Sequence, residues 1–349
     1  MRVENFFSRL VLFIFVIIFF IFSGCAKHEM SRIELALGTV CSVTLFDNAH
    51  SGVFDEIFSG INDIENLMSV SIPSSDISRI NAAAGIEPVQ VHQDVFYVIE
   101  RAKYFAEISG GAFDPTVGPL VSLWGIGSEN QRVPAQEEID ALLPLVNISF
   151  LELNPETHSV FLAKQGMALD LGAIAKGYAA DIAAKTARNM GVKSAKIDLG
   201  GDIILAGTKA DKSPWRVGIQ NPGKEHGSIL GVLRLTVLPA DFPPQKTIVT
   251  SGVYERFFEK DGKHYHHILD PSTGYSSEKG LISVTVITEI SMDADALSTA
   301  LFVLGYEEGI RLLESFPQTE AVFVFKDKTI RTTPGAEFTL TDMEYTVIN

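Results

Sequence analysis

Two short stretches carry side chains that could bind a phosphate and a divalent cation. The first runs from Asp170 to Tyr178 and holds a carboxylate, a lysine and two glycines beside an Ala-rich helical pattern. Backbone N–H groups and the positive end of the dipole meet at the start of a helix, where phosphates often bind. An ordinary strand-to-helix junction capped by Asp170 explains the same residues equally well.

The second stretch contains Asp295 and Thr299, four residues apart on a predicted helix. Side chains at this spacing share one helical face. A carboxylate and a hydroxyl there offer the hard oxygen ligands that Mg²⁺ prefers. Asp293 lies on another face and is expected to cap the helix. Taken alone, an exposed acid in the first turn accounts for Asp295 as well.

Three neighbouring histidines, His264, His266 and His267, suggest a metal site only at first sight. In a strand only His264 and His266 share a face, and no acidic or cysteine partner stands at zinc-site spacing. We therefore expect one histidine to act as a hydrogen-bonding or proton-transfer group. A purely structural histidine is the alternative.

Several common functions are disfavoured by the sequence. It has no GxGxxG or GxxxxGK[ST] motif for a dinucleotide fold or P-loop. It also lacks the GxSxG elbow of many serine hydrolases. The net charge of −15 argues against broad electrostatic binding to nucleic acid or to anionic membranes.

The elements that must position these residues alternate between short strands and helices. Asp94 is the expected N-cap of one helix, and Gly191 follows the end of another. Mixed strands with four or five helices and no linker predict a single α/β (mixed α+β) domain over 25–349. Apolar spacing predicts strands over 35–46, 167–171, 197–203, 215–219, 230–237 and 281–288, helices over 54–68, 94–108, 173–190 and 291–304, and a loop over 239–246.

The N-terminus reads as a targeting segment. Basic residues precede an apolar run of 13 residues, Leu10 to Phe22, which is too short to span a bilayer. Ser23-Gly24-Cys25 then resembles a bacterial lipobox, although Phe22 replaces the usual Leu. We expect a signal peptide over 1–24 and a lipid on Cys25, with a retained N-terminal anchor as the alternative. The only other cysteine, Cys41, is expected in the core.

Taken together, these motifs follow one another in an order that resembles the ApbE family, the FAD:protein FMN transferases. The resemblance covers almost all of the mature chain. It rests on Gly38-Thr39, MSVSIPSSDISRIN, GGAFDPTVGPLVSLWG, DLGAIAKGYAAD, IDLGGDI, TSGVYERFF, HHILDPSTGY and ADALSTALFVLG. Leu269 stands where the family's His-Ile-Asp-Pro motif commonly has Ile.

The resemblance implies a single α/β domain that binds FAD with Mg²⁺, moves FMN to a Thr or Ser of an acceptor protein and releases AMP. It places the Mg²⁺ ligands at Asp295, Thr299 and the backbone carbonyl of Ala173, with His267 and Asp295 as the catalytic residues. It implies acceptors in membrane redox complexes and a lipid anchor on the periplasmic face of the inner membrane. The implied FAD contacts are Leu37, Ser71, Ala112, Phe113, Asp114, Asp170, Lys176, Ser251, Gly252, His267 and Ile268.

One departure leaves the activity open. Ser71 stands where many relatives have an aromatic residue that stacks on the cofactor, and stacking of that kind contributes roughly 0.5–1.5 kcal/mol beyond burial. Weaker FAD retention and access of water would make the chain an FAD pyrophosphatase that releases FMN and AMP. Two further alternatives are a non-catalytic flavin-binding lipoprotein and a solute-binding lipoprotein, although the latter explains none of the motifs.

Overall fold

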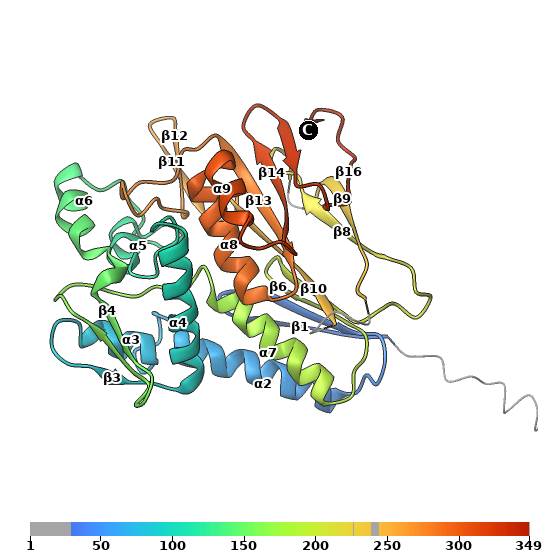
Figure 1. Cartoon of the computed structure of the whole chain (residues 1–349), viewed down its shortest axis with the longest axis horizontal. Coiled ribbons are helices and arrows are strands. Elements are labelled where there is room, and N and C mark those ends of the chain that lie inside the picture. The colour runs from blue at the N-terminus through green and yellow to red at the C-terminus, as the bar shows by residue number, and fades with distance from the viewer. Residues whose placement is uncertain (1–28, 226, 239–243, 349) are drawn as a thin grey trace, which may run out of the picture.

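A nine-stranded sheet forms the centre of the protein, as Figure 1 shows for the computed structural model, which describes residues 29–225, 227–238 and 244–348. The strand order is β1-β2-β6-β7-β10-β13-β14-β15-β17. Neighbouring strands pair antiparallel except β15 with β17. The strands are β1 Met30–Ala36, β2 Thr39–Leu45, β6 Ala195–Leu199, β7 Asp202–Ala206, β10 Gln245–Gly252, β13 Leu281–Thr288, β14 Glu320–Phe325, β15 Thr329–Thr332 and β17 Thr346–Val347.

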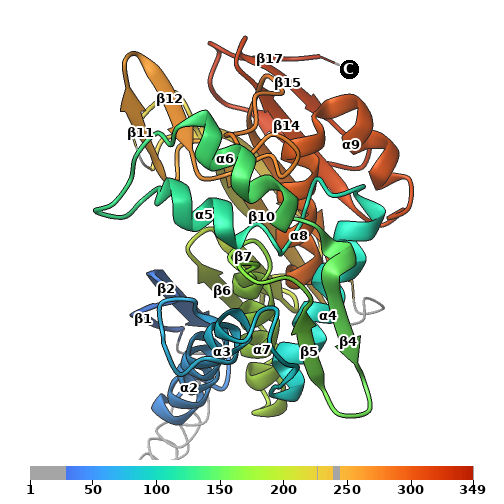
Figure 2. The same cartoon turned by 90° about the vertical axis from the view of Figure 1, so that its left-hand side faces the viewer.

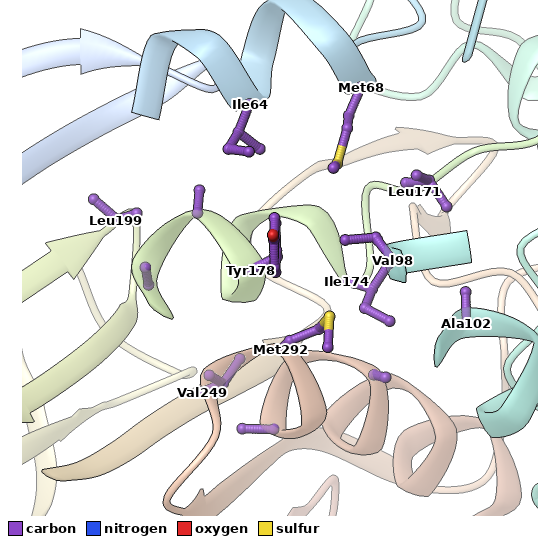
Figure 3. Close-up of a cluster of buried hydrophobic side chains, with 14 of the residues drawn as sticks. Ile64, Met68, Val98, Ala102, Leu171, Ile174, Tyr178, Leu199, Val249 and Met292 are labelled. Atoms are coloured by element: carbon purple, nitrogen blue, oxygen red, sulfur yellow. The ribbon is translucent and has the colours of Figure 1, made fainter. Parts of the chain in front are cut away.

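Four helices cover one face of this sheet in a row. They are α2 (Ser51–Met68), α7 (Ala175–Asn189), α8 (Ser291–Leu304) and α9 (Tyr306–Leu313). The buried face of α7 is mainly alanine, which lets its neighbours approach closely. Figure 3 shows α7 between α2 and α8, with Tyr178 pointing into the shared core.

Helix α8 is buried almost all round. Twelve of its 14 residues are buried, and the two exceptions are Thr299 and Leu304. A helix that is apolar all round belongs inside a protein. Its polar residues are therefore exceptions that need partners.

Two further layers complete the fold (Figure 2). Beyond the helices lie α3 (Asp76–Ala82), α4 (Gln93–Ile108), α5 (Gly118–Trp124), α6 (Gln136–Leu142), two 3-10 turns (Leu143–Leu145, Ile148–Phe150) and the sheet β3 (Val89–Gln90), β5 (Ser159–Leu162), β4 (Leu151–Asn154). On the opposite face of the large sheet, β8 (Trp215–Gln220), β9 (Ile229–Leu235) and β16 (Phe338–Leu340) enclose a second apolar core over β7, β10, β13, β14 and β15. A separate hairpin pairs β11 (Phe257–Lys260) with β12 (Lys263–His266).

The expected single strand over 35–46 was wrong, because the chain turns back in its middle. Leu37 and Gly38 have φ of 54° and 68°, and they form a two-residue loop that joins β1 to β2. Such loops suit the twist of antiparallel strands when both residues take positive φ. The Leu side chain concealed this turn because Leu rarely adopts that conformation.

Five other expectations also needed correction. The strand expected over 197–203 is a hairpin, because the chain turns back at Gly200 and Gly201 between β6 and β7. The described residues form eight α-helices, α2 to α9, and not four or five. His92, not Asp94, is the N-cap of α4. The expected loop over 239–246 includes the start of β10, and residues 239–243 lie outside those described. Met167, Leu169 and Leu171 are buried in alternation, but their segment joins a neighbour only through one bridge, Ala168 to Val117.

Most of the other expectations were confirmed. The helices over 54–68, 173–190 and 291–304 correspond to α2, α7 and α8, and the mixed α/β architecture is as expected. Cys41 is fully buried, and burial raises the pKa of its thiol to about 11. The expected signal peptide and Cys25 lie outside the described residues. Among the residues described, no helix has the length and apolarity to cross a membrane.

Candidate active site

The start of α7 and the middle of α8 meet at Gly177 and Asp295. The backbone N–H of Gly177 donates to Oδ2 of Asp295 at 3.1 Å. A Cβ on Gly177 would lie 2.3 Å from the carbonyl oxygen of Ser291, so only glycine allows the two helices to come this close. Asp295 is thus buried, at 4% exposure, and it is not the exposed acid considered as an alternative.

Ala173 lies just before α7, which begins at Ala175 after the N-cap Ile174. Gly177 lies in the first turn of α7, where backbone N–H groups have no acceptor within the helix, and Asp295 supplies one. Within the described part of the chain, no hydrogen bond reaches the Ala173 oxygen or Oδ1 of Asp295. Ala173 itself is half-buried.

A cluster of hydroxyl groups continues the site along α8. Ser251 Oγ, at the end of β10, lies 3.2 Å from Thr299 Oγ1 and 2.8 Å from Ser298 Oγ. Ser298 in turn donates to the backbone oxygen of Asp295. Thr299 is the half-exposed polar residue of this buried helix. Of the predicted Asp295–Thr299 pair, Asp295 is buried and Thr299 is the member that solvent reaches.

Lys176 forms an ion pair with Asp202, 2.9 Å from Nζ to Oδ2. Asp202 is 1% exposed and follows the Gly200-Gly201 turn that joins β6 to β7. The Lys176 side chain is 29% exposed, whereas that of Asp202 is 2% exposed, so the pair is only partly shielded from solvent. Burial opposes the charge on Lys176, but the nearby Asp202 and Asp295 carboxylates outweigh it and raise the pKa of the ammonium.

The protonation of Asp295 depends strongly on the charges around its carboxyl group. Burial, and then repulsion from Asp202, raise the pKa of its carboxyl to about 7. A nearby positive charge would reverse this shift, because it favours the ionised form. One carboxylate, one hydroxyl and one backbone carbonyl match the oxygen ligands of Mg²⁺. Among the described residues, this site included, no group of three or more His, Cys, Asp or Glu side chains could hold a metal.

Asp293 does not cap α8, which corrects the expectation from sequence. Its carboxylate accepts two hydrogen bonds from Arg101 of α4, at 2.8 and 2.6 Å. Asp181 of α7 takes the capping role and accepts from the N–H groups of Ser291 and Met292. Burial raises the pKa of Asp181 to about 6. Asp293 and Asp295 therefore have separate roles, one structural and one in the site.

His267 and Arg256 border the other side of the site. His267 Nδ1 lies 3.2 Å from the backbone oxygen of Arg256, and its N–H donates to the same oxygen. A carbonyl only accepts, so Nδ1 carries the proton and Nε2 keeps its lone pair. Burial, and then the Arg256 charge, lower the pKa of His267 to about 3.

The other two histidines are not bases for the site. His266 is buried, with Nε2 3.1 Å from the carbonyl of Ser277, and it packs edge-on against Phe302. Burial lowers the pKa of its ring to about 4. His264 stacks on Phe257 in the β11–β12 hairpin. His267 is therefore the histidine that remains a candidate for hydrogen bonding or proton transfer in the site.

The predicted contacts around Asp170 are close together in space. The Asp170 N–H donates to the carbonyl of Pro115, which joins this segment to Ala112–Asp114. Asp170 Oδ1 accepts from Gly172 N. Asp114 is buried and accepts from the N–H and hydroxyl of Thr116, and burial raises the pKa of its carboxyl. Phe113 is buried at 3% exposure.

The remaining predicted contacts lie on four separate segments. Leu37 is half-buried in the β1–β2 turn, and Gly252 ends β10. Ser71 is exposed in the loop between α2 and α3. Ile268 is buried at 5% exposure beside His267.

Sequence reasoning missed four residues of the site: Gly177, Asp202, Arg256 and Ser298. Asp202 follows the glycine pair Gly200-Gly201 in the sequence, but its ion-pair partner Lys176 lies 26 residues earlier, and the sequence does not indicate the pairing. Arg256 has no hydrogen bond or ion pair from its guanidinium among the residues described, although its charge acts on Lys176 and His267. Such an arginine in a protein of net charge −15 is available for an anionic ligand.

The fold and this site define a class: an α/β protein in which a buried carboxylate and nearby hydroxyl groups lie beside a lysine, the kind of groups that phosphoryl-transfer sites use. The chain belongs to the ApbE family, whose model matches residues 37–323.

Individual relatives agree with this assignment. The chain is 38% identical over 328 residues to the FAD:protein FMN transferase of Treponema pallidum, with 88% of each chain covered. It is 40% identical to the enzyme of that name from Klebsiella pneumoniae, covering 78% of this chain and 82% of the relative. The crystal structure of the ApbE protein of Thermotoga maritima has a TM-score of 0.77 at 32% identity, with 91% and 98% covered.

Proposed function

We propose that this chain transfers FMN from FAD to a hydroxyl group of an acceptor protein. In this reaction a Thr or Ser oxygen forms a bond to the FMN phosphorus. The bond from that phosphorus to the bridging oxygen breaks, and AMP leaves with this oxygen. The observation that carries the proposal is the meeting of α7 and α8 at Gly177 and Asp295, near the Lys176–Asp202 ion pair. The oxygens that this region offers are Asp295 Oδ1, Thr299 Oγ1 and the carbonyl of Ala173.

The same oxygens would hold Mg²⁺. Two observations support this assignment: the hydrogen bond from Gly177 fixes the Asp295 carboxylate, and among the described residues the Ala173 carbonyl has no hydrogen-bond donor. When bound, a divalent cation supplies positive charge that offsets the charge developing on phosphate oxygens. Lys176, held by Asp202, adds a second cation at the same place.

His267 is our choice for the group that accepts the hydroxyl proton. Its ring is neutral near pH 7, and Nε2 has a free lone pair. The negative charge of a bound diphosphate would raise the lowered pKa of the ring toward the range that suits a general base. Arg256 lies beside it and would bind the negative charge of the diphosphate. The buried carboxylates of Asp202 and Asp295 are less suitable, because Lys176 and the cation occupy them.

We also propose that the protein acts outside the cytoplasm, attached to the inner membrane through a lipid on Cys25. The apolar run and Ser23-Gly24-Cys25 support this location. Acceptors would then be subunits of membrane redox complexes that expose a Thr or Ser.

A second candidate function is hydrolysis of FAD to FMN and AMP. Ser71 favours it, because this small exposed residue leaves no aromatic ring to cover a bound flavin. In that case water would replace the acceptor hydroxyl. Ser71→Tyr should then increase the retention of FAD and decrease AMP release in the absence of acceptor.

One experiment separates the functions. Mature protein is mixed with FAD and Mg²⁺, with and without an acceptor protein that exposes a Thr in a flavinylation segment. Covalent fluorescence on the acceptor indicates transfer, and AMP release without acceptor indicates hydrolysis. A flavin carrier would show neither, and Asp295→Ala would leave its flavin binding unchanged.

A further inference from the structure

The outward side of the β1–β2 hairpin is an uncharged surface on a strongly acidic protein. Three cross-strand pairs form it, and none of their side chains carries a charge. We call it the β1–β2 outer face; its pairs are Ser31–Thr44, Ile33–Ser42 and Leu35–Val40.

Its apolar residues are unusually exposed. Leu35 is 82% exposed, Ile33 66% and Val40 54%. Helix α2 covers the opposite side of the hairpin. The small sheet β8-β9-β16 covers the outward side from β7 onward and reaches the hairpin only at its open end, where Trp215 packs on Phe46 just past β2. Contiguous exposed apolar residues of this kind mark interaction surfaces more often than chance.

The position of this surface in the chain indicates its partner. Met30 begins β1, and only four residues, 26–29, separate it from Cys25. A chain spans at most about 3.6 Å per residue, so Met30 lies within roughly 18 Å of the Cys25 backbone. A lipid on Cys25 would therefore hold the hairpin against the membrane surface.

The charges beside this surface also fit a bilayer. Lys196 and Asp198, on the neighbouring strand β6, form an ion pair of 3.3 Å and cancel each other. The protein as a whole has a net charge of −15, but the β1–β2 outer face is uncharged. Anionic or zwitterionic headgroups would therefore not repel this face.

We propose that the β1–β2 outer face rests on the phospholipid bilayer and fixes the orientation of the enzyme there. The inference rests on the proposed lipid anchor at Cys25. Three aliphatic side chains are a weak membrane-binding surface alone, but the anchor supplies a high effective concentration.

This orientation would bring the active site close to the membrane. The β1–β2 turn lies next to the β6–β7 turn, since the N–H of Gly200 donates to the carbonyl of Val40. Asp202, which holds Lys176, follows the second turn. Acceptor residues at the membrane surface would therefore be preferred over those far from it.

A tryptophan placed on the surface tests the contact. The full lipidated chain carrying Ile33→Trp is reconstituted in phosphatidylcholine vesicles with brominated acyl chains, which quench tryptophan on contact. We expect roughly half or more of the added emission to be lost. Ile86→Trp is the matched control, because Ile86 is 70% exposed and lies away from this hairpin, beyond α3. It should show no quenching.

The possible outcomes separate the surface from the function. Flotation with vesicles and AMP release from FAD, without quenching at position 33, would overturn the surface and leave the function standing. Loss of flotation would remove the anchor and overturn the inference. Dimers in sedimentation that disappear in Ile33→Ser/Leu35→Ser, or quenching relieved by acceptor, would show that another protein covers this face.

Discussion

The backbone N–H of Gly177 donates to Asp295 across two helices, and this one bond arranges the site. It fixes the carboxylate and gives an acceptor to one of the N–H groups that the first turn of a helix leaves unpaired. The position of Asp295 in the site thus depends on one glycine, whose missing side chain lets α7 and α8 touch.

Asp295→Asn should abolish most turnover while the protein stays folded. An amide binds a divalent cation far more weakly than a carboxylate, so we expect AMP release to fall on the order of 100-fold or more. AMP is measured by chromatography at saturating FAD. Asp293→Asn, two residues earlier, is the matched control. It should retain activity but lower the free energy of unfolding by about 1–3 kcal/mol, because Arg101 loses a charged partner.

Gly177→Ala should damage both stability and the site. A methyl group 2.3 Å from the Ser291 oxygen forces the helices apart, at about 1–3 kcal/mol. Denaturant unfolding and the Mg²⁺ dependence of AMP release report the two effects. Gly60→Ala in α2 is the control: its added Cβ finds ordinary contact at 3.4 Å, so it should stabilise by about 0.5–1 kcal/mol. Equal effects from both variants would contradict the close approach.

Arg256→Gln should weaken the binding of phosphorylated ligands selectively. Loss of a charged hydrogen bond to phosphate costs about 1.5–3 kcal/mol, so the affinities for FAD and ADP should fall roughly 10-fold or more. The affinity for riboflavin, which lacks phosphate, should not change. Titration by flavin fluorescence and calorimetry measures both. Arg234→Gln, at a 63% exposed arginine in the small sheet, should change neither affinity.

His266 should make the protein less stable in mild acid. Burial lowers the pKa of its ring to about 4, against about 6.5 unfolded, so the unfolded chain binds the proton first. The stabilisation is complete above pH 6.5 and is lost as the pH falls toward 4. Between pH 7.5 and 5 this loss amounts to about 2 kcal/mol.

The pH dependence of His266→Gln in denaturant unfolding isolates this effect. The variant cannot titrate, so its stability should change less between pH 7.5 and 5 than that of the wild type. Parallel curves for the two proteins would rule out His266 as the group responsible.

The sequence allowed the prediction of elements whose pattern is repeated many times. Helices α2 and α8 and strand β13 have long apolar patterns, and their bounds were close to those expected. The β1–β2 turn was missed because Leu37 takes a positive φ that its side chain disfavours. Local propensity was overridden there by pairing of the two strands.

The chemistry of the site was only partly predictable. Asp295 and Thr299 could be paired from their spacing on one helix. The Lys176–Asp202 ion pair could not be predicted in this way, because the two residues come into contact only when β7 pairs with its neighbours in the sheet. The role of Asp293 was mistaken for the same reason, since Arg101 is 192 residues away. Ala173 was predicted from family resemblance alone, since a backbone carbonyl gives no signal in the residue types.

Helix α8 limits how this protein can be redesigned or can diverge. Since nearly every residue in it is buried, an altered side chain changes the volume of the core and not merely its surface. Exposed segments such as the loop around Ser71 and the β11–β12 hairpin tolerate insertion far better. We therefore expect differences in acceptor choice between related proteins to lie in these segments and not in the buried helix.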